Sequence, residues 1–169
     1  MKNIENLLMF LTKILGWISA LCITLMMVQV FADVALKYFI KKPIVGTPEI
    51  VGNYYMLAAV FLPLALVEFR NAGVSVTLFY DMMRSDRVKR LIMVLGYIGQ
   101  VIFFAMLAFK TGGDAMESYH KYEIVEAQVM IYVWPGFFTL PIGFGLATLV
   151  NILRIFQIML DPDWEQIVE

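Results

Sequence analysis

The side chains of this sequence that could take part in chemistry lie at the ends of long apolar stretches. Asp33 and Lys37 are one helical turn apart after the first stretch, and Glu49 precedes the second. An ionisable residue at membrane depth often marks an ion or proton pathway. For Asp33 and Lys37 we favour a local ion pair, because neither lies near the middle of an apolar stretch. Glu49 could pair with Lys37 or face a partner protein. Arg70, just after the second stretch, completes this set of candidate ion-pair or subunit-interface residues.

The other reactive side chains form no catalytic or metal-binding pattern. The single cysteine, Cys22, lies in an apolar stretch, and the single histidine, His120, lies in a predicted loop. A zinc site needs several such ligands close together. The sequence also contains no nucleophile–base pair and no phosphate-binding glycine loop. We therefore expect neither catalysis nor a metal or cofactor in this chain, and the net charge of −1 argues against nucleic-acid binding.

The composition indicates a chain surrounded by lipid. Hydrophobic residues make up 61% of the 169 residues and charged residues only 16%, whereas soluble domains are roughly 25% charged. Charged residues leave four uncharged runs, 14–32, 50–67, 91–109 and 127–153. Each is close to or above the length of about 20 residues that a spanning helix needs. We predict an all-α integral membrane protein, a single domain over 1–169, with transmembrane helices at about 14–36, 49–68, 89–110 and 133–156.

The last apolar run leaves the start of its helix open. Pro135 and Pro141 both fall within it, and either could begin or kink the helix. If Pro135 begins the helix, residues 124–132 form an ordered segment outside the membrane. The polar connection 110–126 is predicted to be a loop.

Two short segments are typical of helices that lie in the membrane interface. In 75–84, Val76, Phe79 and Met83 share one helical face, and 3–13 has a similar apolar stripe. The candidate anchors at the membrane boundaries are aromatic, methionine and arginine side chains: Phe79, Met83, Arg84, Arg87, Arg90, Trp134 and Trp164.

Lysine and arginine counts predict the orientation. The N-terminus, the second connection and the C-terminus carry eight of these residues, and the first and third connections carry five. Because basic residues favour the cytoplasmic side, we place both termini in the cytoplasm of a multi-pass protein of the bacterial inner membrane.

Small residues within the predicted helices favour close helix packing. They are Gly16, Ala20, Gly96, Gly99, Gly143, Gly145 and Ala147. Gln100, near the centre of the third helix, is expected to bond another helix rather than a ligand. This pattern does not distinguish packing within the chain from packing against a partner.

Four short motifs, in order, resemble the small membrane subunit of tripartite ATP-independent periplasmic (TRAP) transporters, the DctQ-like family. They are 34–39 closing helix one, Pro48–Glu49 opening helix two, 70–76 after it, and Trp134 followed by 140–144 in helix four. Lys37 replaces the family's usual arginine, and the segment after helix two lacks the histidine and aspartate found in many members.

The resemblance implies a heterodimer with a large membrane subunit that holds the sodium and substrate sites. A periplasmic binding protein would deliver an organic acid, of the sialic acid or C4-dicarboxylate type, and membrane lipids would surround both subunits. The small subunit would enlarge the static scaffold and bind no substrate itself.

Three other classes remain open. A stand-alone small multidrug-type transporter relies on a carboxylate in its first helix, and Asp33 lies too near the helix end to serve well. A four-helix membrane enzyme would need basic groups at depth or paired cysteines, and this sequence has neither. An accessory membrane subunit of another complex is the remaining alternative.

Overall fold

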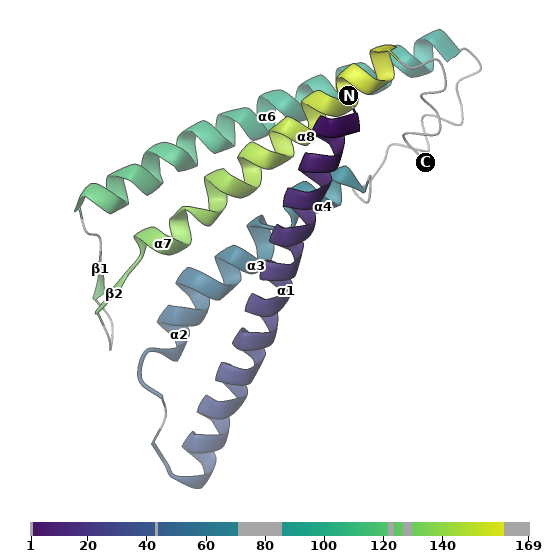
Figure 1. The fold of residues 1–169 in the computed structure, drawn as a ribbon. Helices are drawn as coiled ribbons and strands as arrows, with labels where there is room; N and C mark the ends of the chain where they lie inside the picture. Colours follow the sequence, from purple (N-terminus) through teal and green to yellow (C-terminus); the bar gives the residue numbers. More distant parts are fainter. Residues whose placement is uncertain (1, 43, 71–85, 122–123, 127–129, 161–169) are drawn as a thin grey trace.

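The computed structural model describes residues 2–42, 44–70, 86–121, 124–126 and 130–160, and most of them are helical (Figure 1). Within these residues four helices are long and apolar enough to cross a membrane. Their bounds are Glu5–Phe39, Thr47–Phe69, Val88–Lys121 and Trp134–Leu160. The predicted all-α membrane architecture is therefore confirmed. The predicted interfacial segment 75–84 lies outside the described residues.

The first helix, α1, runs without a break from Lys2 to Phe39 over 38 residues. At 1.5 Å per residue its length is about 57 Å, well beyond a hydrocarbon core of about 30 Å. The sequence predicted a separate segment at 3–13 and a span at 14–36, and the structure joins the two. No proline or glycine interrupts the chain before Gly16, and Lys13 is exposed, so nothing there ends the helix.

The second membrane helix, predicted at 49–68, is irregular. It comprises α2 (Thr47–Ile50), the π-helical turn η1 (Val51–Met56), α3 (Leu57–Phe61) and α4 (Leu64–Phe69). Gly46 precedes it with a φ of 91°, a left-handed conformation that glycine adopts without strain. Pro48 occupies the first turn, where its missing N–H is harmless. Pro63 separates α3 from α4, because its ring cannot donate to the preceding turn.

The third helix, α6, extends from Asp86 to Lys121, so the prediction that it ends near residue 110 was wrong. Two ion pairs at i, i+4 support the extension. Lys110 Nζ lies 2.9 Å from Asp114 Oδ1, and Lys121 Nζ lies 2.5 Å from Glu117 Oε1. Such pairs stabilise a helix even in water. His120 therefore lies in the last turn of a helix rather than in a loop.

A short hairpin leads into the last helix. Strands β1 (Ile124–Glu126) and β2 (Met130–Tyr132) pair antiparallel, with Val125 opposite Ile131. Helix α7 (Trp134–Phe137) has Pro135 in its first turn, and α8 follows from Thr139 to Leu160. Pro135 thus begins the helical region, which extends four residues past the predicted end at 156. The described parts of 124–132 form the ordered segment that this start implied.

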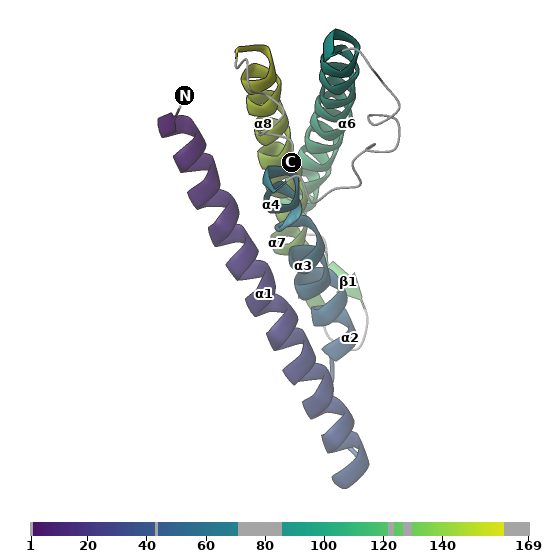
Figure 2. The ribbon, with the colours of Figure 1, turned by 90° about the vertical axis from the view of Figure 1, so that its right-hand side faces the viewer.

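The four helices form an open arrangement (Figures 1 and 2). Helices α6 and α8 run side by side, α4 packs against α8, and α1 packs on α3 and α4 at an angle. The start of α1 and the end of α8 lie at the same end of the molecule. No residue of the most apolar stretch of α6 is buried. The apolar side chains of this stretch are therefore not covered by the other helices of the described chain.

The small interior is built on aromatic rings and glycines. Phe144 of α8 lies between Phe61 of α3 and Phe104 of α6, with ring centroids 5.2 and 6.2 Å away. Gly143 lies directly against the Phe61 carbonyl, so a Cβ there would overlap this backbone oxygen. Gly136 meets the Asn53 carbonyl in the same way. These close approaches hold α7 and α8 against the second membrane helix.

Candidate functional site

The most polar region of the described chain lies where α1, α4, α6 and α8 meet, and Arg154 of α8 is at its centre. This side chain is only 8% exposed. Its Nη2 donates to the Phe69 carbonyl at 2.6 Å, and its Nη1 donates to Gln157 Oε1 at 3.2 Å. The guanidinium also lies 5.4 Å from the centroid of the Phe69 ring. Because Phe69 is the last residue of α4, Arg154 satisfies a carbonyl that the helix end leaves unpaired.

A second arginine performs the same task for another helix. Arg90 of α6 donates through Nε to the Ile158 carbonyl at 2.8 Å, and its Nη2 also donates to this oxygen. Ile158 lies in the last turn of α8. Each arginine therefore joins its own helix to the C-terminal end of a neighbour, where a cation also interacts favourably with the helix dipole.

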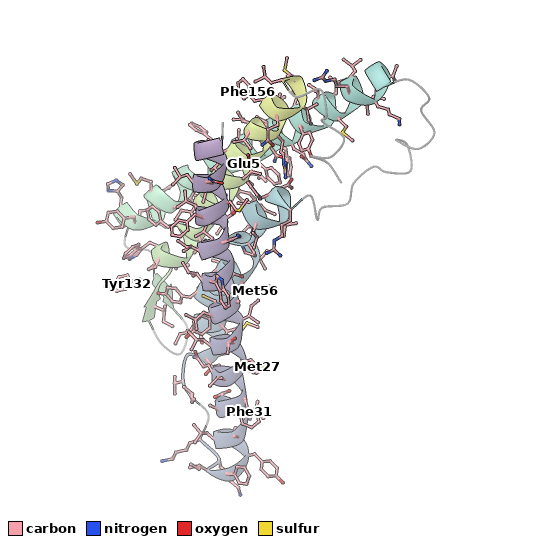
Figure 3. All side chains as sticks on the ribbon, turned by 45° about the vertical axis from the view of Figure 1, so that its right-hand side comes forward. Glu5, Met27, Phe31, Met56, Tyr132 and Phe156 are labelled. Carbon is pink, nitrogen blue, oxygen red and sulfur yellow. The ribbon has the colours of Figure 1, made fainter. Side chains whose placement is uncertain are left out.

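Further polar groups surround the two arginines. Asn151 is fully buried on α8 beside Glu68 of α4, and Tyr97 of α6 lies near both Glu68 and Arg154. Glu5 of α1 is close enough to Arg154 to interact with it electrostatically, and it lies toward the same end of the molecule as Phe156 (Figure 3). We call Glu5, Glu68, Tyr97, Asn151 and Arg154 the polar cluster. It brings polar side chains from all four membrane helices to one end.

The sequence pattern did not indicate this cluster. Arg154 is one of the eight lysines and arginines that were used to predict the orientation. The signal available was its position six residues before the end of a long apolar helix, where a charged side chain needs an internal partner. Which carbonyl it binds depends on the packing of α8 against α4, which the sequence alone does not give.

The opposite end of the molecule holds the acidic residues that the sequence singled out. Asp33 accepts a hydrogen bond from the backbone N–H of Ile44, which fixes the turn after α1. Lys37 is exposed, and the described residues contain no ion pair between it and Asp33 or Glu49. The predicted ion pair is thus replaced by a turn contact, because the chain folds back over the carboxylate. One oxygen of Glu49, Oε2, is buried without a hydrogen-bond partner in the described structure.

Aromatic residues complete this end. The Tyr54 hydroxyl donates to the Tyr132 carbonyl and joins the second helix to the hairpin. Trp134, a predicted interface anchor, packs its ring against Tyr119 at 5.3 Å and Phe138 at 6.2 Å. Tyr119 in turn contacts His120. Ring contacts therefore hold the C-terminal end of α6 against α7.

The remaining predicted site residues are distributed as follows. Arg70 is exposed beside Lys13 in a groove between α1 and α4. Arg90, predicted as a membrane-interface anchor, donates a hydrogen bond to the Ile158 carbonyl at the end of α8. Arg87 lies within α6, but its side chain is outside the described part of the structure. The other predicted anchors also lie outside the described residues, namely Phe79, Met83, Arg84 and Trp164.

Several predicted packing residues face outward. Gly96, Gly99 and Gln100 are exposed on one face of α6, and no heavy atom lies within 4 Å of a Cβ placed at either glycine. Gln100 therefore lies on a surface of α6 that is open in the described structure, and the expected bond to another helix would have to be made with a partner. By contrast, Gly16 contacts Leu66, and Gly143 and the fully buried Ala147 pack inside as predicted.

The contacts of the polar cluster are suited to joining helices. Among the described residues no three of His, Cys, Asp and Glu are grouped so as to hold a metal ion. Arg154 donates through its two Nη atoms to an amide and a carbonyl oxygen, and Arg90 donates to a carbonyl oxygen, so both arginines join helices. The arrangement is suited to fixing four helices relative to one another.

Comparison with known proteins gives the family. The model of the family "Tripartite ATP-independent periplasmic transporters, DctQ component" matches residues 26–161. Neither the curated proteins nor the solved structures yielded a match to the chain. The family match covers most of the 169 residues and includes all of helices two to four. The chain therefore belongs to the DctQ family and is the small membrane subunit of a TRAP transporter, a multi-pass membrane protein.

Proposed function

We propose that this chain is the static scaffold of a TRAP transporter and braces a large membrane subunit, which imports an organic acid together with sodium. The acid would be of the sialic acid or C4-dicarboxylate type, delivered by a periplasmic binding protein. We also propose the bacterial inner membrane as its location, with both termini in the cytoplasm. Family membership and the distribution of basic residues support these finer points.

The observation that carries the bracing role is the exposed face of α6. Gly96, Gly99 and Gln100 lie on one side of the helix, because residues three and four apart share a face. In lipid, a mid-span glutamine has no hydrogen-bond partner, whereas glycines let a second helix approach closely. Both features favour a partner helix over lipid at this surface. We call these three residues the α6 face.

Leucine substitutions on this face test the proposal. In Gly96→Leu combined with Gly99→Leu, the added side chains would prevent close approach of a partner helix. We expect loss of copurification with the large subunit in mild detergent and loss of sodium-dependent acid uptake. A Cβ added at either position meets no heavy atom of the described chain within 4 Å, and both positions are exposed, so the subunit itself should still fold.

Gly113→Leu provides the matched control. Gly113 is also exposed on α6, also has open space around its Cβ position, and adjoins the charged Asp114 near the helix end. We expect the control to copurify and to support uptake as the wild type does. Normal assembly of the Gly96→Leu, Gly99→Leu variant would contradict the assignment of the α6 face.

A further inference from the structure

A groove between α1 and α4 combines two cations with an apolar floor. It has a volume of about 280 Å³ and is lined by Lys13, Gly16, Trp17, Ala20, Leu66 and Arg70. Lys13, Gly16, Trp17 and Ala20 follow one another along α1, while Leu66 lies in α4 and Arg70 caps its C-terminal end. Residues from two antiparallel helices thus place both positive charges at the same end of the groove.

The charges of the groove are available for a ligand. Lys13 and Arg70 are both exposed, and neither forms an ion pair within the described residues. The nearby polar cluster is separate, because Arg154 is already bonded to the Phe69 carbonyl and Gln157. Two unpaired cations on adjacent helices form a site for an anion, since phosphate oxygens accept hydrogen bonds from both ammonium and guanidinium groups.

The remaining lining residues indicate where this anion comes from. Trp17 is 78% exposed, and an outward-facing tryptophan one turn from a lysine is typical of the level of the lipid headgroups. Below it, Gly16 and Ala20 leave α1 without large side chains, and Leu66 of α4 fills part of the floor. The groove is polar at one end and apolar toward the membrane centre. A phospholipid has the same distribution, whereas a free phosphate ion is polar all round.

We propose that this groove binds an anionic phospholipid, with Lys13 and Arg70 on its phosphate and its acyl chain over Gly16 and Ala20. The site takes one class of ligand, a negatively charged glycerophospholipid such as phosphatidylglycerol. Its location at the predicted cytoplasmic end agrees with the negative charge of that leaflet. A bound lipid would fill the space between α1 and α4 and hold these helices at a fixed angle. The inference does not depend on the identity of the transported acid.

Tryptophan quenching measures this binding directly. The full chain would carry Trp134→Phe and Trp164→Phe, so that Trp17 is its single tryptophan. It would be placed in phosphatidylcholine vesicles that contain either brominated phosphatidylglycerol or brominated phosphatidylcholine. We expect the anionic lipid to quench Trp17 at a mole fraction lower by roughly tenfold, because each cation at the surface favours an anionic lipid. Equal quenching by the two lipids would overturn the proposal.

Two charge variants complete the test. Lys13→Gln with Arg70→Gln should abolish the preference. Lys37→Gln with Lys42→Gln removes two exposed lysines, one in the last turn of α1 and one just after it, and should leave the preference intact. The reverse pattern, or a preference that survives in the first variant, would refute the site. Arg70→Lys should retain most of the preference.

The salt dependence of the lipid preference tests the site with Lys13 and Arg70 unchanged. Added salt should weaken the preference for the anionic lipid, since both cations are exposed. A preference that does not change with salt would count against a charge-based site. Inorganic phosphate at millimolar concentration should not relieve the quenching, and relief would indicate a free-anion site and overturn the lipid assignment.

Discussion

At the end of the molecule that holds the start of α1, Arg90 and Arg154 bind backbone carbonyls of neighbouring helices. At the opposite end, exposed pairs within a single helix and aromatic contacts predominate. The arginine–carbonyl bonds join different helices. The ion pairs at the opposite end lie within α6 and support only that helix. Charge therefore has two uses in this chain. Arginines bonded to backbone carbonyls fix the helices relative to one another, and surface charge lengthens α6.

The largest expected effect is at Arg154. Arg154→Met keeps the volume but leaves the Phe69 carbonyl and Gln157 without their donor. Hydrogen bonds to a charged group contribute about 1.5–3 kcal/mol each, so we expect a loss of about 3 kcal/mol and a lower unfolding midpoint in detergent. Arg154→Lys should lie between wild type and Arg154→Met, because it keeps the charge and one donor. An unchanged midpoint in Arg154→Met would show that the arginine end does not hold the helices.

The next effect is expected at the interior between the two ends. Gly143→Leu forces a side chain onto the Phe61 carbonyl, and overpacking of this kind costs about 1–3 kcal/mol. Gly145→Leu is the matched control, because no heavy atom lies within 4 Å of its Cβ position. We expect the unfolding midpoint to fall for the first variant alone. Equal midpoints would mean that α8 does not pack on α3 as described.

A smaller effect is expected at the hairpin. Tyr54→Phe removes the hydroxyl that bonds the Tyr132 carbonyl, and a neutral hydrogen bond contributes about 1 kcal/mol. Hydrogen exchange should quicken in 130–132 while the exchange of α8 stays unchanged. Faster exchange throughout α8 would contradict the separation between the two ends.

No effect on transport is expected at Asp33. Asp33→Asn still offers an oxygen to the Ile44 N–H, so the turn should persist. A scaffold therefore retains acid uptake, whereas a stand-alone proton-coupled exporter that relied on this carboxylate would lose its activity. Loss of uptake in a variant that still assembles would revive the exporter interpretation.

Much of the fold could be predicted from the sequence, because charge placement and hydropathy determine where helices cross a membrane. The four spans follow from these signals, whereas they left the start of the last helix open between Pro135 and Pro141, and the structure places it at Pro135. The ends of α1 and α6 were less predictable, since apolar stretches do not show where a helix continues into water. The pairs Lys110–Asp114 and Glu117–Lys121 could have indicated that α6 reaches residue 121.

The site was harder to predict than the spans. The partners of Arg154 and Arg90 are backbone carbonyls, which every residue has, so residue types carry no signal for them. Gln100 was expected to bond another helix, and it lies exposed in this chain; the helical pattern gives the face of α6 but not the helix that this face meets. Asp33 illustrates the same point, since its partner is the backbone of a turn.

The central claim is that this chain braces a large membrane subunit and does not act alone. It is tested most directly by isolating the wild-type chain from its native membrane in mild detergent and weighing the intact complex by native mass spectrometry. We predict one copy of this chain with one copy of a large multi-spanning protein. A preparation that contains only homodimers of this chain would contradict the claim.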